Sequence, residues 1–247
     1  MKEESVVGIF DSGVGGFTVY KKIKEVTSAN CIYYGDCLNA PYGNKEEFEI
    51  RELIKADILF LEEKKVTHFV NACNSMSVLT TDALLQESGI ATDHYTDMIR
   101  AFDKHAVCKE GEIVLVVATS ATLRSGVYQD VLTHKGVNAA VYAYTDLAAA
   151  IENNRTREEL LTIVETGIVY AKEVGATSII YGCTHYPLIH GLFLEVKEKL
   201  GWQGEFIDPA IYVAQEVRVW GITGEHGFCP YSSKDTAVFI KNVIKFV

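Results

Sequence analysis

The chain has 247 residues, which is long for one compact core and comfortable for two, because domains cluster at roughly 100 to 150 residues. With 48% hydrophobic and 23% charged residues, its composition is that of an ordinary globular protein, not a disordered or fibrous one. The formal net charge of −10 argues against a nucleic-acid partner, which would require clustered Lys and Arg. The sequence therefore predicts two small globular domains.

The beginning of the chain favours a cytoplasmic protein. The apolar run 6–10 follows two acidic residues and lacks the basic leader and the cleavage site of a secretory signal. No stretch approaches the roughly 20 apolar residues that span a bilayer, so we expect no membrane partner. The six cysteines form no CxxC pair and no structural zinc spacing, and in a reducing cytoplasm they should be free thiols.

Short β-branched runs alternate with amphipathic segments along the chain, a pattern that predicts parallel sheets covered by helices. The predicted strands are 5–10, 31–34, 67–72, 90–92, 113–118, 137–142, 177–181 and 204–206. The predicted helices are 16–27, 45–63, 76–88, 96–105, 122–134, 145–152, 157–174, 187–199 and 233–246. Thr156, with Glu159 three residues later, is the expected cap of helix 157–174.

The two halves of the chain resemble each other. Residues 7–13 match residues 115–121, and residues 69–75 match residues 179–185, so that Cys73 corresponds to Cys183. The alternative explanation for this similarity is that any two α/β units share a strand-turn-helix pattern. The nearly equal offsets and the matching cysteines favour an internal repeat.

Small polar turns follow four of the predicted strands, at residues 11–13, 73–75, 119–122 and 183–185. In open α/β sheets, ligands bind beyond the carboxyl ends of the strands. The helix N-termini at this edge attract anions. The sequence therefore predicts a shared cleft that binds a small carboxylic acid.

Cys73 and Cys183 each lie between a predicted strand and a helix. Because a helix N-terminus lowers the pKa of a thiol from about 8.5, we expect reactive thiolates there. Two equivalent thiols suit racemisation, in which one removes a proton from a carbon and the other returns a proton to the opposite face. A hydrolase needs a single nucleophile, and a redox dithiol has its cysteines close in sequence. The remaining cysteines are interpreted as packing residues: Cys31, Cys37, Cys108 and Cys229.

Four motifs extend over most of the chain: residues 10–16 (FDSGVGG), 40–43 (APYG), 72–75 (ACNS) and 182–188 (GCTHYPL). In these residues the sequence closely resembles glutamate racemase of the aspartate/glutamate racemase superfamily. The resemblance implies two pseudo-symmetric, flavodoxin-like α/β domains with parallel sheets and an active site in the cleft between them. The first domain would comprise residues 1–93 plus 208–247, and the second residues 94–207.

The same resemblance implies an isomerase that interconverts L- and D-glutamate without pyridoxal phosphate, metal or any other cofactor, and that supplies D-glutamate for peptidoglycan. It implies that Cys73 and Cys183 are the acid/base thiols, with Asp11 beside the first, His185 beside the second and Glu152 as a further acidic helper. Regenerating a thiolate requires such titratable neighbours. The implied substrate contacts are Ser12, Pro41, Tyr42, Gly43, Asn74, Ser75, Thr119, Thr122 and Thr184.

Several alternatives stay open. Residues 11–16 could form a phosphate-binding loop, but they lack both GxGxxG and a Walker lysine. A racemase for aspartate or another acidic substrate is a second alternative, because segments 75–76, 90–95 and 141–146 depart from the family pattern. A catalytically silent protein that binds an acidic ligand is a third. The sequence also leaves open whether the protein is a monomer or a homodimer.

Overall fold

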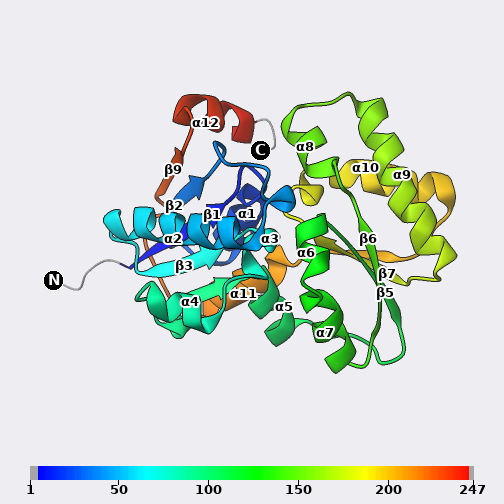
Figure 1. The fold of residues 1–247 in the computed structure, drawn as a ribbon, viewed down its shortest axis with the longest axis horizontal. Helices are drawn as coiled ribbons and strands as arrows, with labels where there is room; N and C mark the ends of the chain where they lie inside the picture. The colour runs from blue at the N-terminus through cyan, green and yellow to red at the C-terminus, as the bar shows by residue number, and fades with distance from the viewer. Residues whose placement is uncertain (1–4, 245–247) are drawn as a thin grey trace.

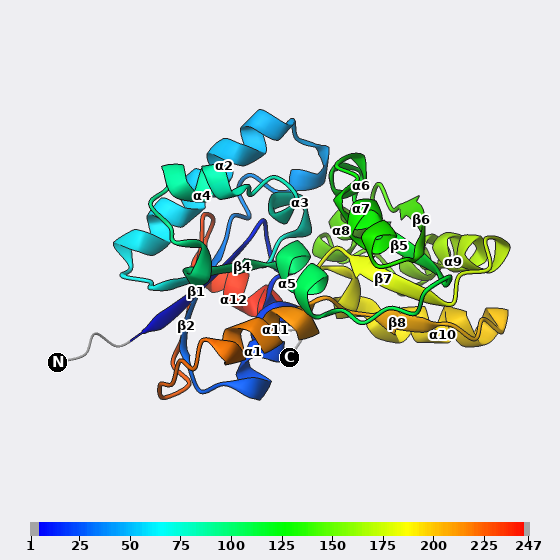
Figure 2. The same ribbon diagram turned by 90° about the horizontal axis from the view of Figure 1, so that it is seen from below.

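The computed structural model describes residues 5–244. The chain forms two lobes that lie side by side, each with a parallel sheet between helices (Figures 1 and 2). The strands of the first sheet are β1 (Val6–Asp11), β2 (Asn30–Gly35), β3 (His68–Asn71), β4 (Tyr95–Asp97) and β9 (Phe228–Ser232). Those of the second sheet are β5 (Ile113–Ala118), β6 (Asn138–Ala143), β7 (Ser178–Gly182) and β8 (Glu205–Ile207).

Each lobe also has its own set of helices. Those of the first lobe are α1 (Phe17–Val26), α2 (Glu47–Glu63), α3 (Asn74–Ser77), α4 (Asp82–Glu87), α5 (Met98–His105), α11 (Ala210–Val219) and α12 (Thr236–Ile244). Those of the second lobe are α6 (Ser120–Arg124), α7 (Val127–His134), α8 (Leu147–Glu152), α9 (Arg157–Glu173) and α10 (His190–Leu200). Short 3-10 turns occur at η1 (Tyr42–Asn44), η2 (Thr92–His94) and η3 (Tyr186–Ile189).

The two sheets share one strand order. The first runs β4-β3-β1-β2-β9 and the second β8-β7-β5-β6, so that β1 corresponds to β5 and β3 to β7. This is the correspondence that the sequence repeat predicts, with β9 added to the first sheet alone. In register, Asp11 lies beside Gly35 and Ala118 beside Gly182. The turns that follow these strands therefore gather at one edge of each sheet.

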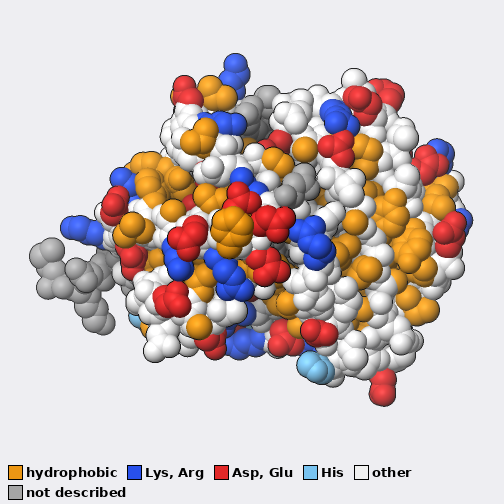
Figure 3. Space-filling view, in the orientation of Figure 1, with side chains coloured by type: hydrophobic (Ala, Val, Ile, Leu, Met, Phe, Trp, Pro, Cys, Tyr) orange, Lys and Arg blue, Asp and Glu red, His pale blue; other side chains and the backbone are white. Residues whose placement is uncertain are grey.

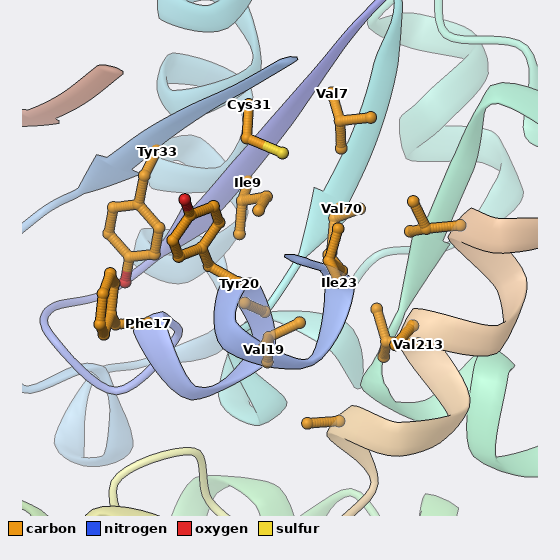
Figure 4. Packing of buried hydrophobic residues seen from close by; sticks show 14 of the residues in the cluster. Val7, Ile9, Phe17, Val19, Tyr20, Ile23, Cys31, Tyr33, Val70 and Val213 are labelled. Carbon is orange, nitrogen blue, oxygen red and sulfur yellow. The ribbon is translucent and has the colours of Figure 1, made fainter. Parts of the chain in front are cut away.

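Alternate residues of β1 enter different layers of the first lobe. Ile9 belongs to the core formed with α1 and α11, whereas Phe10 belongs to the core formed with α2. Figure 4 shows Ile9 and Val70 of the sheet lying over Val19 and Ile23 of α1. Both faces of the sheet are thus buried, as is usual for parallel strands.

Helix α5 joins the two lobes. Its Met98 and Ala101 pack in the core of the first lobe, whereas Ile99 and Phe102 pack with β5 and α7 of the second. Strand β4, just before it, pairs with β3, so the first sheet extends beyond residue 93, where the sequence placed the domain boundary. The division into residues 1–93 plus 208–247 and residues 94–207 stays a prediction.

Several predicted elements need correction. The predicted strand 90–92 is wrong: Ile90 packs with the α2 core, and the sheet instead takes up the buried residues of β4. The predicted helix 76–88 is two helices, because Thr81 caps a new helix, α4. The predicted helix 122–134 is also two, separated by Gly126 at a φ of 70°.

The C-terminal part differs most from the expectation. Strand β9 and helix α11 were not predicted, and the predicted helix 233–246 begins only at Thr236 as α12; its last two residues lie outside the described part of the chain. By contrast, the predicted cap of α9 is confirmed. The Thr156 hydroxyl accepts from the Glu159 N–H, and the Glu159 carboxylate accepts from the Thr156 N–H.

Charged side chains of both signs are interspersed over the first lobe on the face shown in Figure 3, whereas apolar side chains gather over part of the second lobe. Within residues 5–244, no helix has the length and hydrophobicity needed to cross a membrane. The same residues contain no cluster of three or more His, Cys, Asp or Glu side chains suited to a metal ion.

Candidate active site

The carboxyl edges of the two sheets face each other between the lobes (Figure 1). A cavity of about 200 Å³ is lined by residues from both edges. The first lobe contributes the turns after β1, β2, β3 and β9, and the second contributes the turns after β5, β6 and β7 together with α8. The lining residues are Ser12, Cys37, Ala40, Pro41, Tyr42, Gly43, Cys73, Asn74, Ser75, Thr119, Tyr144, Thr145, Asp146, Ala148, Ala149, Glu152, Asn153, Cys183, Thr184, His185 and Lys234. Of the site residues named from the sequence, all line this cavity except Asp11 and Thr122.

The two thiols enter this cavity from opposite lobes. Cys73 follows β3, and Cys183 follows β7 at the corresponding place in the second sheet. Each residue is buried, with only 6% of its surface exposed. Both residues line the same cavity.

The Cys73 thiol donates a hydrogen bond to the Ser12 hydroxyl, with 3.7 Å between sulfur and oxygen. Ser12 in turn donates to Oδ1 of Asp11 at 3.5 Å. Burial, followed by the charge of Asp11, raises the pKa of Cys73 well above its usual range. The expectation of a lowered pKa is therefore wrong for Cys73, because α3 is only four residues long and burial outweighs its N-terminal dipole.

Asp11 lies behind the cavity wall and is fully buried. Its Oδ1 accepts the Gly13 N–H at 2.7 Å, and its Oδ2 accepts the Thr184 hydroxyl at 3.0 Å. Burial raises the pKa of Asp11 even though His185 and these two hydrogen bonds oppose the shift. Because Thr184 belongs to the second lobe, Asp11 is also a point of contact between the lobes.

Cys183 has a different set of neighbours. Its sulfur lies 3.7 Å from Nδ1 of His185, and Nε2 of His185 lies 2.8 Å from Oε1 of Glu152. Burial alone would lower the pKa of His185, but Cys183 and Glu152 raise it well above its usual range. Burial acts to raise the pKa of Glu152, yet the hydrogen bond with His185 leaves it lowered. These opposite shifts favour an imidazolium paired with a carboxylate, with Nδ1 of the ring facing the Cys183 sulfur.

The glycines after β1 allow the two lobes to approach closely. A Cβ atom on Gly15 would lie 2.6 Å from both Nδ1 of His185 and Oγ1 of Thr184, and one on Gly13 would collide with Oε1 of Glu152. Any larger side chain at these positions would push His185 and Glu152 away from the first lobe. The glycines of the first motif thus serve contact between the lobes.

A cluster of hydroxyl groups connects the lobes on the other side of the cavity. The Ser75 hydroxyl lies 3.0 Å from that of Thr119 and 3.3 Å from that of Thr122, which are themselves 3.1 Å apart. Thr122 does not reach the cavity, so its place is behind the wall, where it holds Ser75 and Thr119.

The segment 40–43 forms a third wall and is anchored by its tyrosine. The Tyr42 hydroxyl donates to Oδ2 of Asp36 at 2.6 Å, and burial raises the Tyr42 pKa so that the phenol stays neutral. A Cβ atom on Gly43 would lie 3.0 Å from Cβ of Thr119, which places this segment directly against the second lobe.

Sequence reasoning missed several cavity residues. Cys37, which was assigned to packing, lies in the wall two residues after β2, and Tyr144 to Asp146 follow β6. Ligands bind beyond the carboxyl ends of parallel strands, and the residues that follow β2 and β6 are therefore candidates for the same reason as the four turns named from the sequence. Lys234, which is exposed, lines the cavity from the turn after β9, a strand that was itself not predicted.

Replacing Glu152 by Gln should destabilise the fold in a pH-dependent way. The loss in free energy of unfolding should be about 1.5–3 kcal/mol, the usual contribution of a hydrogen bond to a charged group. This loss should be largest at pH values between the lowered pKa of Glu152 and the raised pKa of His185. It should shrink at acid pH, where Glu152 is protonated, and at alkaline pH, where His185 loses its proton.

Urea unfolding at a series of pH values measures this difference, with the exposed Glu198→Gln as the matched control. A loss of stability that did not change with pH would contradict the imidazolium-carboxylate pair.

Comparison with known proteins agrees with this geometry. The profile of the Asp/Glu/Hydantoin racemase family matches residues 15–217. The glutamate racemase of Lactobacillus helveticus is 33% identical over 213 residues, which cover 85% of this chain and 78% of that protein. The structure of glutamate racemase from Aquifex pyrophilus has a TM-score of 0.75 at 28% identity, covering 97% of this chain and 95% of that one. Isoform RacE1 from Bacillus anthracis shares the fold, with a TM-score of 0.86 at 23% identity, covering 98% of this chain and 93% of that one. The chain therefore belongs to the Asp/Glu/Hydantoin racemase family, in the group of the glutamate racemases.

Proposed function

We propose that the protein is a glutamate racemase in which Cys73 and Cys183 act as the two bases. The observation that carries the proposal is that thiols from matching strand ends line one small cavity from opposite lobes, each beside its own proton-exchanging neighbours. The sequence similarity to glutamate racemases supports glutamate as the substrate.

In this mechanism the α-carbon of glutamate lies between the two sulfurs. One thiolate takes the α-proton, and the electron pair left on carbon takes a proton from the opposite thiol. The first cysteine is then a thiol and the second a thiolate, and the configuration at carbon is inverted. The reverse reaction exchanges the two roles.

The neighbours of each thiol support the regeneration of its starting state. Ser12 lies between the Cys73 sulfur and Asp11, and offers a route by which a proton can leave or return. His185 plays the corresponding part for Cys183, with Glu152 holding the ring by its other nitrogen. Because burial raises the pKa of Cys73, the thiol form of this residue is favoured, and this is the form that donates a proton; in the opposite direction Cys73 acts as the thiolate.

The cavity wall suits an acidic amino acid. Hydroxyl and amide groups of Ser12, Asn74, Ser75, Thr119 and Thr184 can bind carboxylate and ammonium groups. Lys234 is the one Lys or Arg side chain among the lining residues, and its exposed charge would attract an anion. The D-glutamate formed would serve peptidoglycan synthesis in the cytoplasm.

Cys73→Ser and Cys183→Ser should each lower the rate of racemisation by about 10²- to 10⁴-fold, because a hydroxyl is a far weaker acid than a thiol. Polarimetry of L-glutamate solutions measures the rate. Cys108→Ser and Cys229→Ser are the matched controls, since neither thiol lines the cavity, and both should keep the wild-type rate. A wild-type rate in either cavity variant would refute the two-base mechanism.

The substrate is tested with a panel of L-amino acids and a hydantoin. Glutamate should have the highest kcat/KM, and aspartate, one methylene shorter, should be lower by roughly 10- to 200-fold. A higher kcat/KM for aspartate than for glutamate would show that aspartate, not glutamate, is the substrate. Tight glutamate binding without exchange of the α-proton would instead identify a silent binding protein.

A further inference from the structure

We infer that Tyr128 is a positioning residue for the reaction, which holds the side-chain amide of Asn74 so that its Nδ2 group can bind the substrate. Tyr128 lies in the second lobe and Asn74 in the first, so substrate binding is tied to the contact between the lobes. The inference rests on the proposed function and adds to it a residue that does not line the cavity.

The central contact is a short hydrogen bond between two buried side chains. The Tyr128 hydroxyl, on α7, donates to Oδ1 of Asn74 at a distance of 2.7 Å. Tyr128 is fully buried, and Asn74 is 2% exposed and lines the cavity. Burial raises the pKa of Tyr128 well above its usual range, so the phenol keeps its proton and remains a donor.

This hydrogen bond decides which atom of Asn74 is left for a ligand. With Oδ1 occupied, the amide can offer only its donor group, and Nδ2 is buried without a hydrogen-bond partner among the described residues. A buried donor without a partner is unfavourable. A carboxylate oxygen of the bound amino acid is an acceptor of the kind that would satisfy it.

The surroundings of Tyr128 fix its position. Its ring packs edge-on against Phe102 of α5, with 5.6 Å between ring centroids, and α5 is the helix that joins the lobes. The next residue after Asn74, Ser75, is also hydrogen-bonded to second-lobe hydroxyl groups. The start of α3 is thus held from the second lobe at two successive residues, and Asn74 is oriented only while the lobes stay in this arrangement.

Tyr128→Phe removes the hydroxyl and leaves the ring in its core. We expect KM for glutamate to rise about tenfold, as for the loss of one hydrogen bond, with a smaller change in kcat. Tyr181→Phe is the matched control: this tyrosine is also buried, its hydroxyl bonds to His190, and it does not line the cavity. Its KM should equal that of the wild type.

A double-mutant cycle with Asn74→Ala separates positioning from a general structural role. If Tyr128 acts through Asn74, adding Tyr128→Phe to Asn74→Ala should cause no further rise in KM. Additive effects of the two substitutions, or an unchanged KM in Tyr128→Phe alone, would overturn the inference. Racemisation of glutamate by the wild type tests the proposed function separately.

A measurement on the unaltered protein covers the case in which Tyr128→Phe does not fold. The side-chain NH₂ resonances of Asn74, followed by NMR, should shift when D-glutamate is added, because Nδ2 gains an acceptor. Resonances that stayed unchanged at saturating D-glutamate would overturn the inference.

Discussion

The active-site arrangement depends on the close packing of the glycine turn after β1 against the turn after β7. Gly13 and Gly15 leave no room for a side chain between the first lobe and the group formed by Glu152, Thr184 and His185. The hydrogen bond from Thr184 to Asp11 lies at the same place. This contact brings together two strand ends that are far apart in the sequence, and the cavity between the thiols is its consequence.

Burial and the neighbouring side chains set the acid-base properties of the site. Excluding water raises the pKa of Cys73, and a thiol of raised pKa yields a more strongly basic thiolate. That basicity is useful for taking a weakly acidic proton from carbon. On the other side, His185 and Glu152 hold a proton as an ion pair beside Cys183. The two halves are alike in topology but differ in the groups beside each thiol, which are Ser12 and Asp11 for Cys73, and His185 and Glu152 for Cys183.

Much of this could be predicted from the sequence. Carboxyl ends of parallel strands meet at one edge, so the turns at Asp11 and Cys73 were expected to lie together in the first sheet, and those at Thr119 and Cys183 in the second. The raised pKa of Cys73 could not be predicted, because the burial that causes it comes from packing in the core with Phe10, Tyr42 and residues of α2, which are distant in the sequence. Strand β9 was missed since it contains Pro230 and is an edge strand, where strand signals are weak. The contact of Tyr128 with Asn74 joins two helices from different lobes and leaves no local pattern in the sequence.

The central claim is that two thiols act on opposite faces of one α-carbon. Racemisation of L-glutamate in D₂O, stopped at low conversion, tests it most directly when the deuterium content of each enantiomer is measured by mass spectrometry. The D-glutamate formed should carry deuterium at the α-carbon while the remaining L-glutamate keeps its protium, because the thiol that removes the proton is not the thiol that returns one. D-glutamate that retained the original proton, or L-glutamate that gained deuterium as fast as product formed, would indicate a single base and contradict the account.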